Sequence, residues 1–138
     1  MKFIVDKKER YTVFEVLEDK LNTLIAPELK TELTLLHNEG IKNIILNLKN
    51  VAFVDSSGLS AILVGNRLCT HADGIFVVAE ITDNVKRLMK ISQLDSILQL
   101  IPTVVEARDY VMMTELMKEL NGTEDLQEAA EEEEGKEK

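Results

Sequence analysis

The chain has 138 residues, 45% of them hydrophobic and 30% charged, which is enough for one folded domain with one core. Its net charge of −9 excludes a basic nucleic-acid-binding surface, and no apolar run approaches the roughly 20 residues that cross a membrane. The N-terminus MKFIVDKKER is too charged for a secretion signal, and the single cysteine permits no internal disulfide or cysteine-based metal site, so a cytoplasmic location is expected.

The first half of the chain predicts two strands, a helix and a buried strand. Residues 2–18 alternate apolar and polar side chains on both sides of a polar turn, as two adjacent strands do. Residues 26–40 follow a helical period, with Pro27 in the first turn and Gly40 as the stop. The nearly continuous apolar run KNIILNL, residues 42–48, is typical of a strand covered on both faces. The apolar face of the helix comprises Ala26, Leu29, Leu33 and Leu36.

A second helix is predicted directly after the segment DSSG, residues 55–58, and runs to about His71. The strand before this segment is expected to be the central one, so the junction lies at its carboxyl end, where α/β sheets place binding sites. The segment GIFVVAEI, residues 74–81, predicts another buried strand. One side of the helix is marked by Leu59, Ile62, Leu63 and Asn66.

The remaining residues predict a short helix, an edge strand and a long helix. Thr82 or Asp83 can cap the short helix, SILQLI forms the edge strand, and Thr103 caps the long helix, which Asn121-Gly122 should end. The methionines Met112, Met113 and Met117 are expected to pack inward. Two leading strands followed by alternation predict an α/β fold, a mixed sheet of about five strands with about four helices packed on it.

The C-terminal segment is strongly acidic. Residues 124–138 hold eight acids and two lysines, net −6, which leaves −3 for the rest of the chain. Such a composition is typical of a disordered, solubilising segment, and docking to a basic partner is the alternative. The expected organisation is therefore one domain over residues 1–120 and a disordered acidic tail over 121–138.

The segment Asp55-Ser56-Ser57-Gly58 at the strand-to-helix junction allows four interpretations. The first is a helix cap, since a serine before an apolar helix can accept a backbone N–H bond and contribute about 1 kcal/mol. Capping accounts for one hydroxyl only. It does not account for Gly58, which costs helix propensity in the first turn.

Two enzymatic interpretations are weaker. A nucleophile elbow needs glycines on both sides of the serine, but the residue two before either serine is Val54 or Asp55. The only candidate bases, His37 and His71, end predicted helices and are expected to be exposed. A phospho-accepting aspartate with magnesium could combine Asp55 with Glu18-Asp19. Domains of that kind alternate strand and helix from the start, whereas this chain opens with two adjacent strands.

The fourth interpretation is a phosphorylatable serine on an interaction surface. A phosphate adds about −1.5 to −2 charges, and the N–H groups at a helix N-terminus tolerate that anion. A partner that fits the neutral hydroxyl would lose affinity for the dianion, which makes a binding switch without catalysis by this chain. On this interpretation Gly58 allows a partner or a kinase to approach closely.

The stretch NIILNLKNVAFVDSSGLSAIL, followed by GIFVVAEITDNVKRLMKISQLDSIL, resembles the STAS domain of bacterial anti-sigma factor antagonists and sulphate-transporter tails. The resemblance covers roughly residues 3–118. It implies a small, non-enzymatic, cofactor-free α/β domain that binds a serine-kinase anti-sigma factor. It also implies that this kinase phosphorylates the serine after the aspartate, here Ser56, and that a serine phosphatase resets it. Ser57 is then the expected helix cap.

The resemblance places partner binding at Asp55, Ser56, Ser57 and Gly58, and at Asn22 in the loop before the first helix. Asn22 stands where the family often has an aspartate, so the contribution of this loop to recognition is open. Two alternatives also stay open: a non-switching structural STAS module of a multiprotein complex, and a small-ligand or nucleotide-binding module. A basic patch on the short helix is a candidate contact for an acidic partner and comprises Lys86, Arg87 and Lys90.

Overall fold

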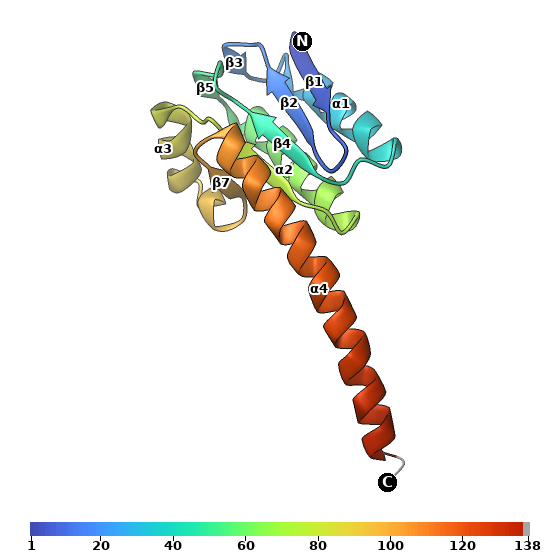
Figure 1. Ribbon diagram of the computed structural model, residues 1–138. Coiled ribbons are helices and arrows are strands. Elements are labelled where there is room, and N and C mark those ends of the chain that lie inside the picture. The colour runs from blue at the N-terminus through green and yellow to red at the C-terminus, as the bar shows by residue number, and fades with distance from the viewer. Residues whose placement is uncertain (137–138) are drawn as a thin grey trace.

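The computed structural model describes the backbone of residues 1–136 and the side chains of residues 1–121. A five-stranded sheet with the order β1-β2-β4-β6-β7 runs through the middle of the domain (Figure 1). β1 is antiparallel to β2, and every other neighbouring pair is parallel, which confirms the predicted mixed α/β sheet. The strands are β1 (Phe3–Lys7), β2 (Thr12–Val16), β4 (Ile44–Asn47), β6 (Phe76–Ala79) and β7 (Gln99–Ile101).

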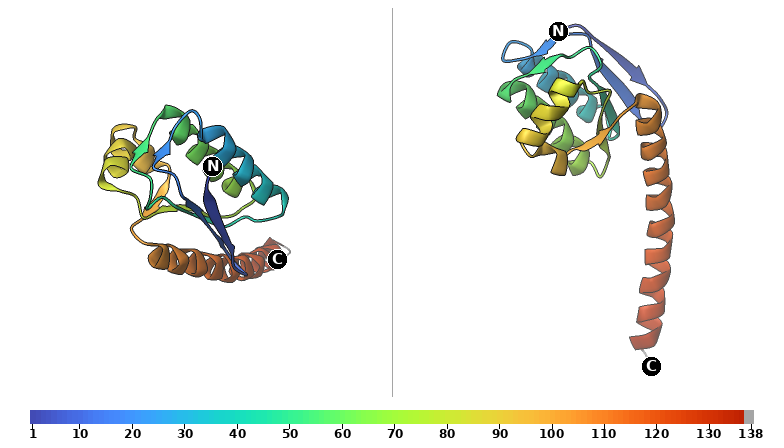
Figure 2. Two further views of the ribbon diagram at one scale, coloured as in Figure 1. Left: turned by 90° about the horizontal axis from the view of Figure 1, so that it is seen from above. Right: turned by 90° about the vertical axis from the view of Figure 1, so that its left-hand side faces the viewer.

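Helices cover both faces of the sheet. α1, α2 and α3 lie on one face and α4 lies alone on the other (Figure 2). Within the described part of the chain, no helix is both long enough and apolar enough to cross a membrane. The helices are α1 (Ala26–Asn38), α2 (Ser56–His71), α3 (Asp83–Ile91) and α4 (Val104–Lys136), and a short 3₁₀ turn spans Leu94–Ser96.

The two-sided cover explains the continuous apolar strands. Ile44 and Leu46 of β4 join the core beneath α1, α2 and α3, whereas Ile45 joins Ala107 and Val111 of α4 on the other face. Successive side chains of a strand point to opposite faces, so a strand covered on both sides needs apolar residues at every position.

α1 has the apolar face that the sequence predicts. Pro27 lies in the first turn, and Gly40 adopts a φ of +92° just after the helix, a conformation that favours glycine. The buried residues of the helix are Ala26, Leu29, Leu33 and Leu36, which confirms the predicted set.

The predicted apolar residues of α2 do pack against the core, but most of the fully buried positions of the helix are small residues. Ile62 is buried, but Leu59 and Leu63 are only half-buried, and the rest of the buried side consists of small residues. A Cβ at Gly65 would lie 2.6 Å from the ring of Phe76, so the helix lies too close to the sheet for larger side chains there. The buried residues of α2 are Gly58, Ala61, Ile62, Gly65 and Cys69.

A second, two-stranded sheet was not predicted. β3 (Lys20–Leu21) pairs in parallel with β5 (Phe53–Val54), immediately before the DSSG segment. β4 is the central strand as expected, but the chain leaves β4 after Asn47, and the strand that leads into the junction is β5. Strands of two residues carry no periodic pattern from which sequence could predict them.

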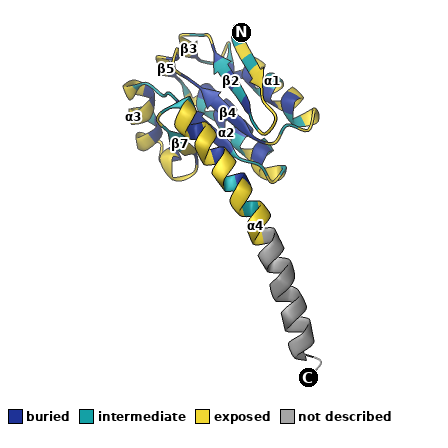
Figure 3. Ribbon diagram, in the orientation of Figure 1, coloured by how far each residue is buried: buried dark blue, intermediate teal, exposed yellow. Residues whose placement is uncertain are grey.

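α4 differs from its prediction in length and in orientation. It continues past Asn121-Gly122, its predicted end, to Lys136. The methionines expected to pack inward are exposed, Met112 by 40%, Met113 by 58% and Met117 by 54%. Much of the described part of α4 is exposed (Figure 3). The inner side is instead occupied by Ala107 and Val111, which are fully buried. The expectation of disorder for the acidic tail concerns residues whose side chains lie outside the described part and stays a prediction.

Candidate functional site

The junction between β5 and α2 is built on Asp55, which is the N-cap of α2. Its backbone is extended, with φ −96° and ψ −175°, and its Oδ1 accepts the N–H of Gly58 at 2.9 Å. The prediction that Ser57 caps the helix is therefore wrong. Aspartate and serine cap equally well, and the β5 pairing ends the extended backbone at Asp55, which leaves Ser57 inside the first turn.

The second carboxylate oxygen of Asp55 holds the loop that precedes α1. Oδ2 accepts the backbone N–H of Thr23 at 3.2 Å and the Thr23 hydroxyl at 3.4 Å. The Thr23 hydroxyl also lies 3.3 Å from the Ser57 hydroxyl. One carboxylate thus ties the start of α2 to residues more than 30 positions earlier.

Ser56 is the first residue of α2 and its side chain is exposed. Within the part of the chain that the structure describes, its hydroxyl makes no hydrogen bond to another residue, unlike that of Ser57. The free N–H groups and the dipole of the helix N-terminus favour an anion at this position. Ser56 is therefore accessible to a modifying enzyme and lies where a phosphate can be accommodated.

Gly58 is buried, which corrects the expectation that it gives clearance to a partner. A Cβ at this position would lie 2.3 Å from the carbonyl oxygen of Leu21 and 2.7 Å from Cγ1 of Val54. The glycine is required inside the protein, because it lets α2 approach the small β3–β5 sheet. It does not face outward to a partner.

The loop of residues 22–25 lies beside the junction because β3 pairs with β5. Asn22 shapes this loop, since its Oδ1 accepts the N–H groups of Leu24 at 3.1 Å and Ile25 at 3.3 Å. Its side chain thus supports the turn, while Thr23 makes the contact with the junction. Sequence reasoning missed Thr23, and only knowledge of the β3–β5 pairing could have revealed it.

Exposed apolar side chains surround the junction. Leu24 is 81% exposed, Phe53 is 53% exposed and Ile91 is 73% exposed. A groove of about 240 Å³ runs between β5 and α3. The predicted basic patch borders it: Arg87 lines the groove, and Lys86 and Lys90 are exposed on the same helix. The groove is lined by Ala52, Phe53, Val54, Asn84, Val85, Arg87, Leu88 and Ile91.

The structure places both histidines far from the serines. His37 and His71 lie near each other, with ring centroids 6.3 Å apart, at the end of α2 opposite Ser56. Sixteen residues of helix separate that end from the junction by roughly 22 Å. His71 is exposed as expected, whereas His37 is half-buried, with its Nδ1 buried and unpartnered among the described residues. Neither can act as a base toward Ser56 in this arrangement.

Two of the acids considered for a magnesium pocket, Glu18 and Asp55, accept hydrogen bonds from other groups. Glu18 accepts the backbone N–H of Lys2 at 2.9 Å, and the two carboxylate oxygens of Asp55 accept hydrogen bonds from Gly58 in α2 and from Thr23 in the loop before α1. Over the described residues, no three His, Cys, Asp or Glu side chains gather in a way that could hold a metal ion.

Cys69 lies on the buried side of α2, away from the junction. It is 1% exposed, and burial raises the pKa of its thiol to about 12. The thiol is therefore protonated at neutral pH and behaves as a small core residue.

The sequence of this chain is similar to those of known proteins. The model of the STAS domain family matches residues 2–107. An anti-sigma-B factor antagonist of Staphylococcus aureus is 28% identical over 79 residues, which are 57% of this chain and 73% of that protein.

Solved structures share the fold. An anti-sigma factor antagonist from Mycobacterium paratuberculosis superposes with a TM-score of 0.72 and 21% identity, covering 80% of this chain and 93% of that one. The phosphorylated form of the Bacillus cell fate determinant SpoIIAA superposes with a TM-score of 0.63 and 20% identity, covering 80% and 99%. At these identities, the likeness concerns the arrangement of the strands and helices.

Proposed function

The chain belongs to the STAS domain family, and on that basis we propose that it is an anti-sigma factor antagonist controlled by phosphorylation of Ser56. In its unphosphorylated form it binds a serine-kinase anti-sigma factor and so frees a sigma factor. The kinase uses ATP to phosphorylate Ser56, and a serine phosphatase reverses the modification. The chain is the substrate of this chemistry, acts in the cytoplasm and needs no cofactor.

The observation that carries the proposal is the position of Ser56. Its side chain is exposed at the first turn of α2, while Asp55 beside it is fixed by hydrogen bonds to Gly58 and Thr23. A phosphate on Ser56 would meet the N-terminal end of a helix, so the fold need not open to receive it. The phosphate would also lie beside the Asp55 carboxylate. Together the two groups would concentrate negative charge on the surface that a partner contacts.

The surroundings of Ser56 support its role as part of a partner-binding surface. Leu24 in the loop before α1 and Phe53 in β5 expose large apolar side chains, and the groove between β5 and α3 continues this surface toward Arg87. Apolar area next to a switchable charge suits an interface that the modification weakens. The related SpoIIAA has been solved in both unphosphorylated and phosphorylated forms, which supports the same switch here.

Incubation with a cognate kinase and ATP tests the proposal directly. Mass spectrometry should locate one phosphate on Ser56, and the Ser56→Ala variant should take up none. Ser57→Ala is the matched control, because it removes the adjacent hydroxyl and should leave phosphorylation intact. Phosphate on another residue, or none with any cognate kinase, would refute the switch. Equal partner binding by phosphorylated and unphosphorylated protein would favour a structural STAS module.

A further inference from the structure

The outer side of α4 carries a cluster of large apolar side chains that no other part of the described chain covers. Their exposed fractions range from 40% for Met112 to 58% for Met113. Folded domains rarely leave a contiguous group of this kind open to water unless it serves as an interaction site. The cluster, called the methionine face below, comprises Met112, Met113, Leu116, Met117 and Leu120.

The rotation of α4 about its own axis is fixed, so the methionine face cannot simply turn inward. Ala107 and Val111 are fully buried against Ile45 and Val77 of the sheet. One turn further, Glu115 is almost fully buried. Turning the helix would expose these side chains and break the polar contacts of Glu115.

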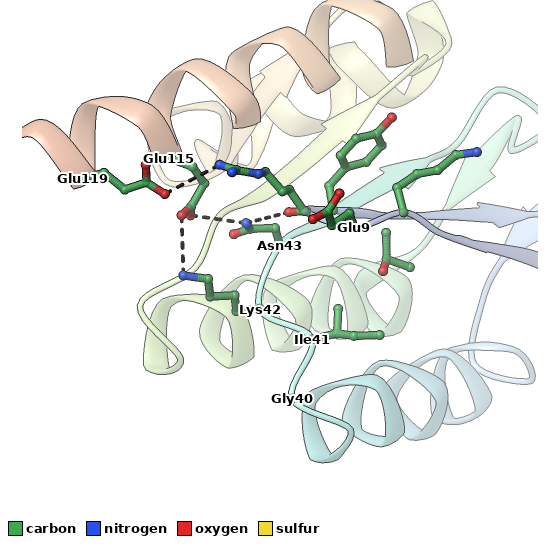
Figure 4. Close-up of a pocket in the computed structure, with 11 residues that line it drawn as sticks. Glu9, Gly40, Ile41, Lys42, Asn43, Glu115 and Glu119 are labelled. Atoms are coloured by element: carbon green, nitrogen blue, oxygen red, sulfur yellow. Dashed lines mark hydrogen bonds and ion pairs between the residues drawn. The ribbon is translucent and has the colours of Figure 1, made fainter.

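Those polar contacts lie in a pocket between α4 and the loop before β4 (Figure 4). Glu115 accepts a hydrogen bond from Asn43 Nδ2 at 3.2 Å and pairs with Lys42 Nζ at 3.5 Å. On the same side of the helix, Lys118 Nζ donates to the carbonyl oxygen of Asp73 at 2.9 Å. A buried carboxylate that loses its hydrogen-bond partners lowers the stability of the fold. The contacts of Glu115 therefore favour a single orientation of α4.

A second copy of this chain is a poor occupant for the face. Tyr110, Met113, Met117 and Leu120 follow the three-four spacing of a coiled coil, but the next such position is Glu124. The apolar seam therefore lasts about two heptads, whereas a coiled coil needs at least three or four. Each chain also carries eight acids within residues 124–138, so two copies would repel each other.

We propose that the methionine face is a docking site for a basic amphipathic helix of a partner protein. Methionine side chains are flexible and polarisable, and they suit grooves and faces that accept the apolar side of a helix. The acid-rich sequence that follows the face in the same chain supplies charge complementary to lysine and arginine on the partner. An anionic membrane surface lacks this complementarity and would be repelled.

This proposal is independent of the Ser56 switch. α4 lies on one face of the sheet, while α2, which begins at Ser56, lies on the other (Figure 2). A helix docked on α4 therefore does not cover Ser56, and a kinase at the junction does not cover the methionine face. The two surfaces are available to two different partners.

The test uses a fluorescein-labelled synthetic peptide of leucine and lysine, patterned as an amphipathic helix, and the full chain in an anisotropy titration. The wild-type protein should bind it, and Met113→Gln/Met117→Gln should bind at least about tenfold more weakly. The matched control is Leu35→Gln/Ile97→Gln, which removes two exposed apolar side chains away from α4 and should stay within about twofold. Circular dichroism checks that each variant is folded.

Further arms separate the docking site from general attraction between opposite charges. A scrambled peptide of equal composition should bind at least about tenfold more weakly, and Ser56→Asp should bind the original peptide within about twofold of wild type. Equal binding by wild type and the methionine variant would overturn the proposal. So would a wild-type dimer in sedimentation equilibrium that Met113→Gln/Met117→Gln dissociates, because the occupant would then be a second copy. None of these outcomes depends on phosphorylation of Ser56.

Discussion

Thr23 and Asp55 are 32 positions apart in the sequence, yet Asp55 Oδ2 accepts hydrogen bonds from both the backbone N–H and the hydroxyl of Thr23. The same carboxylate caps α2 through Gly58. Asp55 therefore organises the surface around Ser56 in addition to carrying charge beside it. Substitutions at Asp55 and at its neighbour Ser57 should consequently differ in their effects.

Asp55→Ala is expected to lower the free energy of unfolding by about 1–3 kcal/mol, since it removes a helix cap and a link between two loops. Ser57→Ala removes only one exposed hydroxyl contact and should cost about 0.5 kcal/mol or less. Urea unfolding at neutral pH measures both. A larger cost for Ser57→Ala would mean that Ser57, not Asp55, caps the helix.

Gly58→Ala is expected to destabilise the fold by about 1–3 kcal/mol, since the added methyl group meets the Leu21 carbonyl at 2.3 Å. The matched control is Ser60→Ala in the same helix, which should stay within about 0.5 kcal/mol of wild type. Thermal unfolding compares the two. If Gly58→Ala were as stable as wild type and lost only partner binding, the glycine would serve the interface after all.

Ser56→Asp should leave the free energy of unfolding within about 1 kcal/mol of Ser56→Ala, because a negative charge at a helix N-terminus is tolerated. Binding to the anti-sigma partner should nevertheless weaken by about 1–3 kcal/mol in the Asp form. Titration calorimetry with the purified partner measures this difference. Ser56→Asn is the control for side-chain size. If Ser56→Asn bound the partner as weakly as Ser56→Asp, the loss of affinity would come from the larger side chain and not from its charge.

The buried Cys69 thiol predicts a dependence of stability on alkaline pH. Its pKa is raised to about 12 in the folded protein, above the unfolded value of 9.0, so folding favours the protonated form. The contribution to stability is complete below pH 9.0 and is lost as the pH rises toward about 12, at up to roughly 1.4 kcal/mol per pH unit.

The measurement for Cys69 is a comparison of wild type with Cys69→Ala by urea unfolding from pH 8 upward, because the difference between the two proteins isolates the contribution of the thiol. The free-energy difference between the two proteins should change with pH in the direction that weakens wild type. Reaction of the native thiol with a disulfide reagent at pH 8 should also be slow compared with the unfolded chain. A rapid native reaction would show that the thiol is accessible.

Glu115→Ala is expected to cost about 1–3 kcal/mol, since it leaves the buried amide of Asn43 without its acceptor on α4. Glu119→Ala, one turn further, affects an exposed ion pair with Arg10 at 3.6 Å and should cost under about 1 kcal/mol. Hydrogen exchange in α4 should rise for Glu115→Ala only. Equal effects of the two substitutions would remove the role of Glu115 in fixing the helix.

The sequence predicted the main sheet and three of its helices well, because their residues repeat with a clear period. The four inward residues of α1 and the continuous apolar runs of β4 and β6 follow directly from burial on one or two faces. The predicted orientation of α4 is wrong because it depends on composition and not on a period. Its methionines have the composition of a packed face, but the side that meets the sheet is formed by Ala107, Val111 and Glu115.

The candidate site was predicted in position but not in internal structure. The DSSG segment indicates a strand-to-helix junction, and the structure has one there. The roles within it depend on β3 and β5, two-residue strands that no period can reveal and that bring Leu21 and Thr23 to the junction. For this reason the sequence pattern alone favours Ser57 as the helix cap and an outward-facing Gly58, whereas the structure has Asp55 as the cap and Gly58 buried.

The pairing of β3 with β5 has a consequence for the rate of recognition. Because Thr23 and Asn22 are tied down when the domain folds, the loop beside Ser56 loses its conformational freedom before any partner arrives. Association with a partner then loses little further conformational entropy, because the loop already has its bound conformation. Encounter, rather than loop rearrangement, should therefore limit the speed of complex formation.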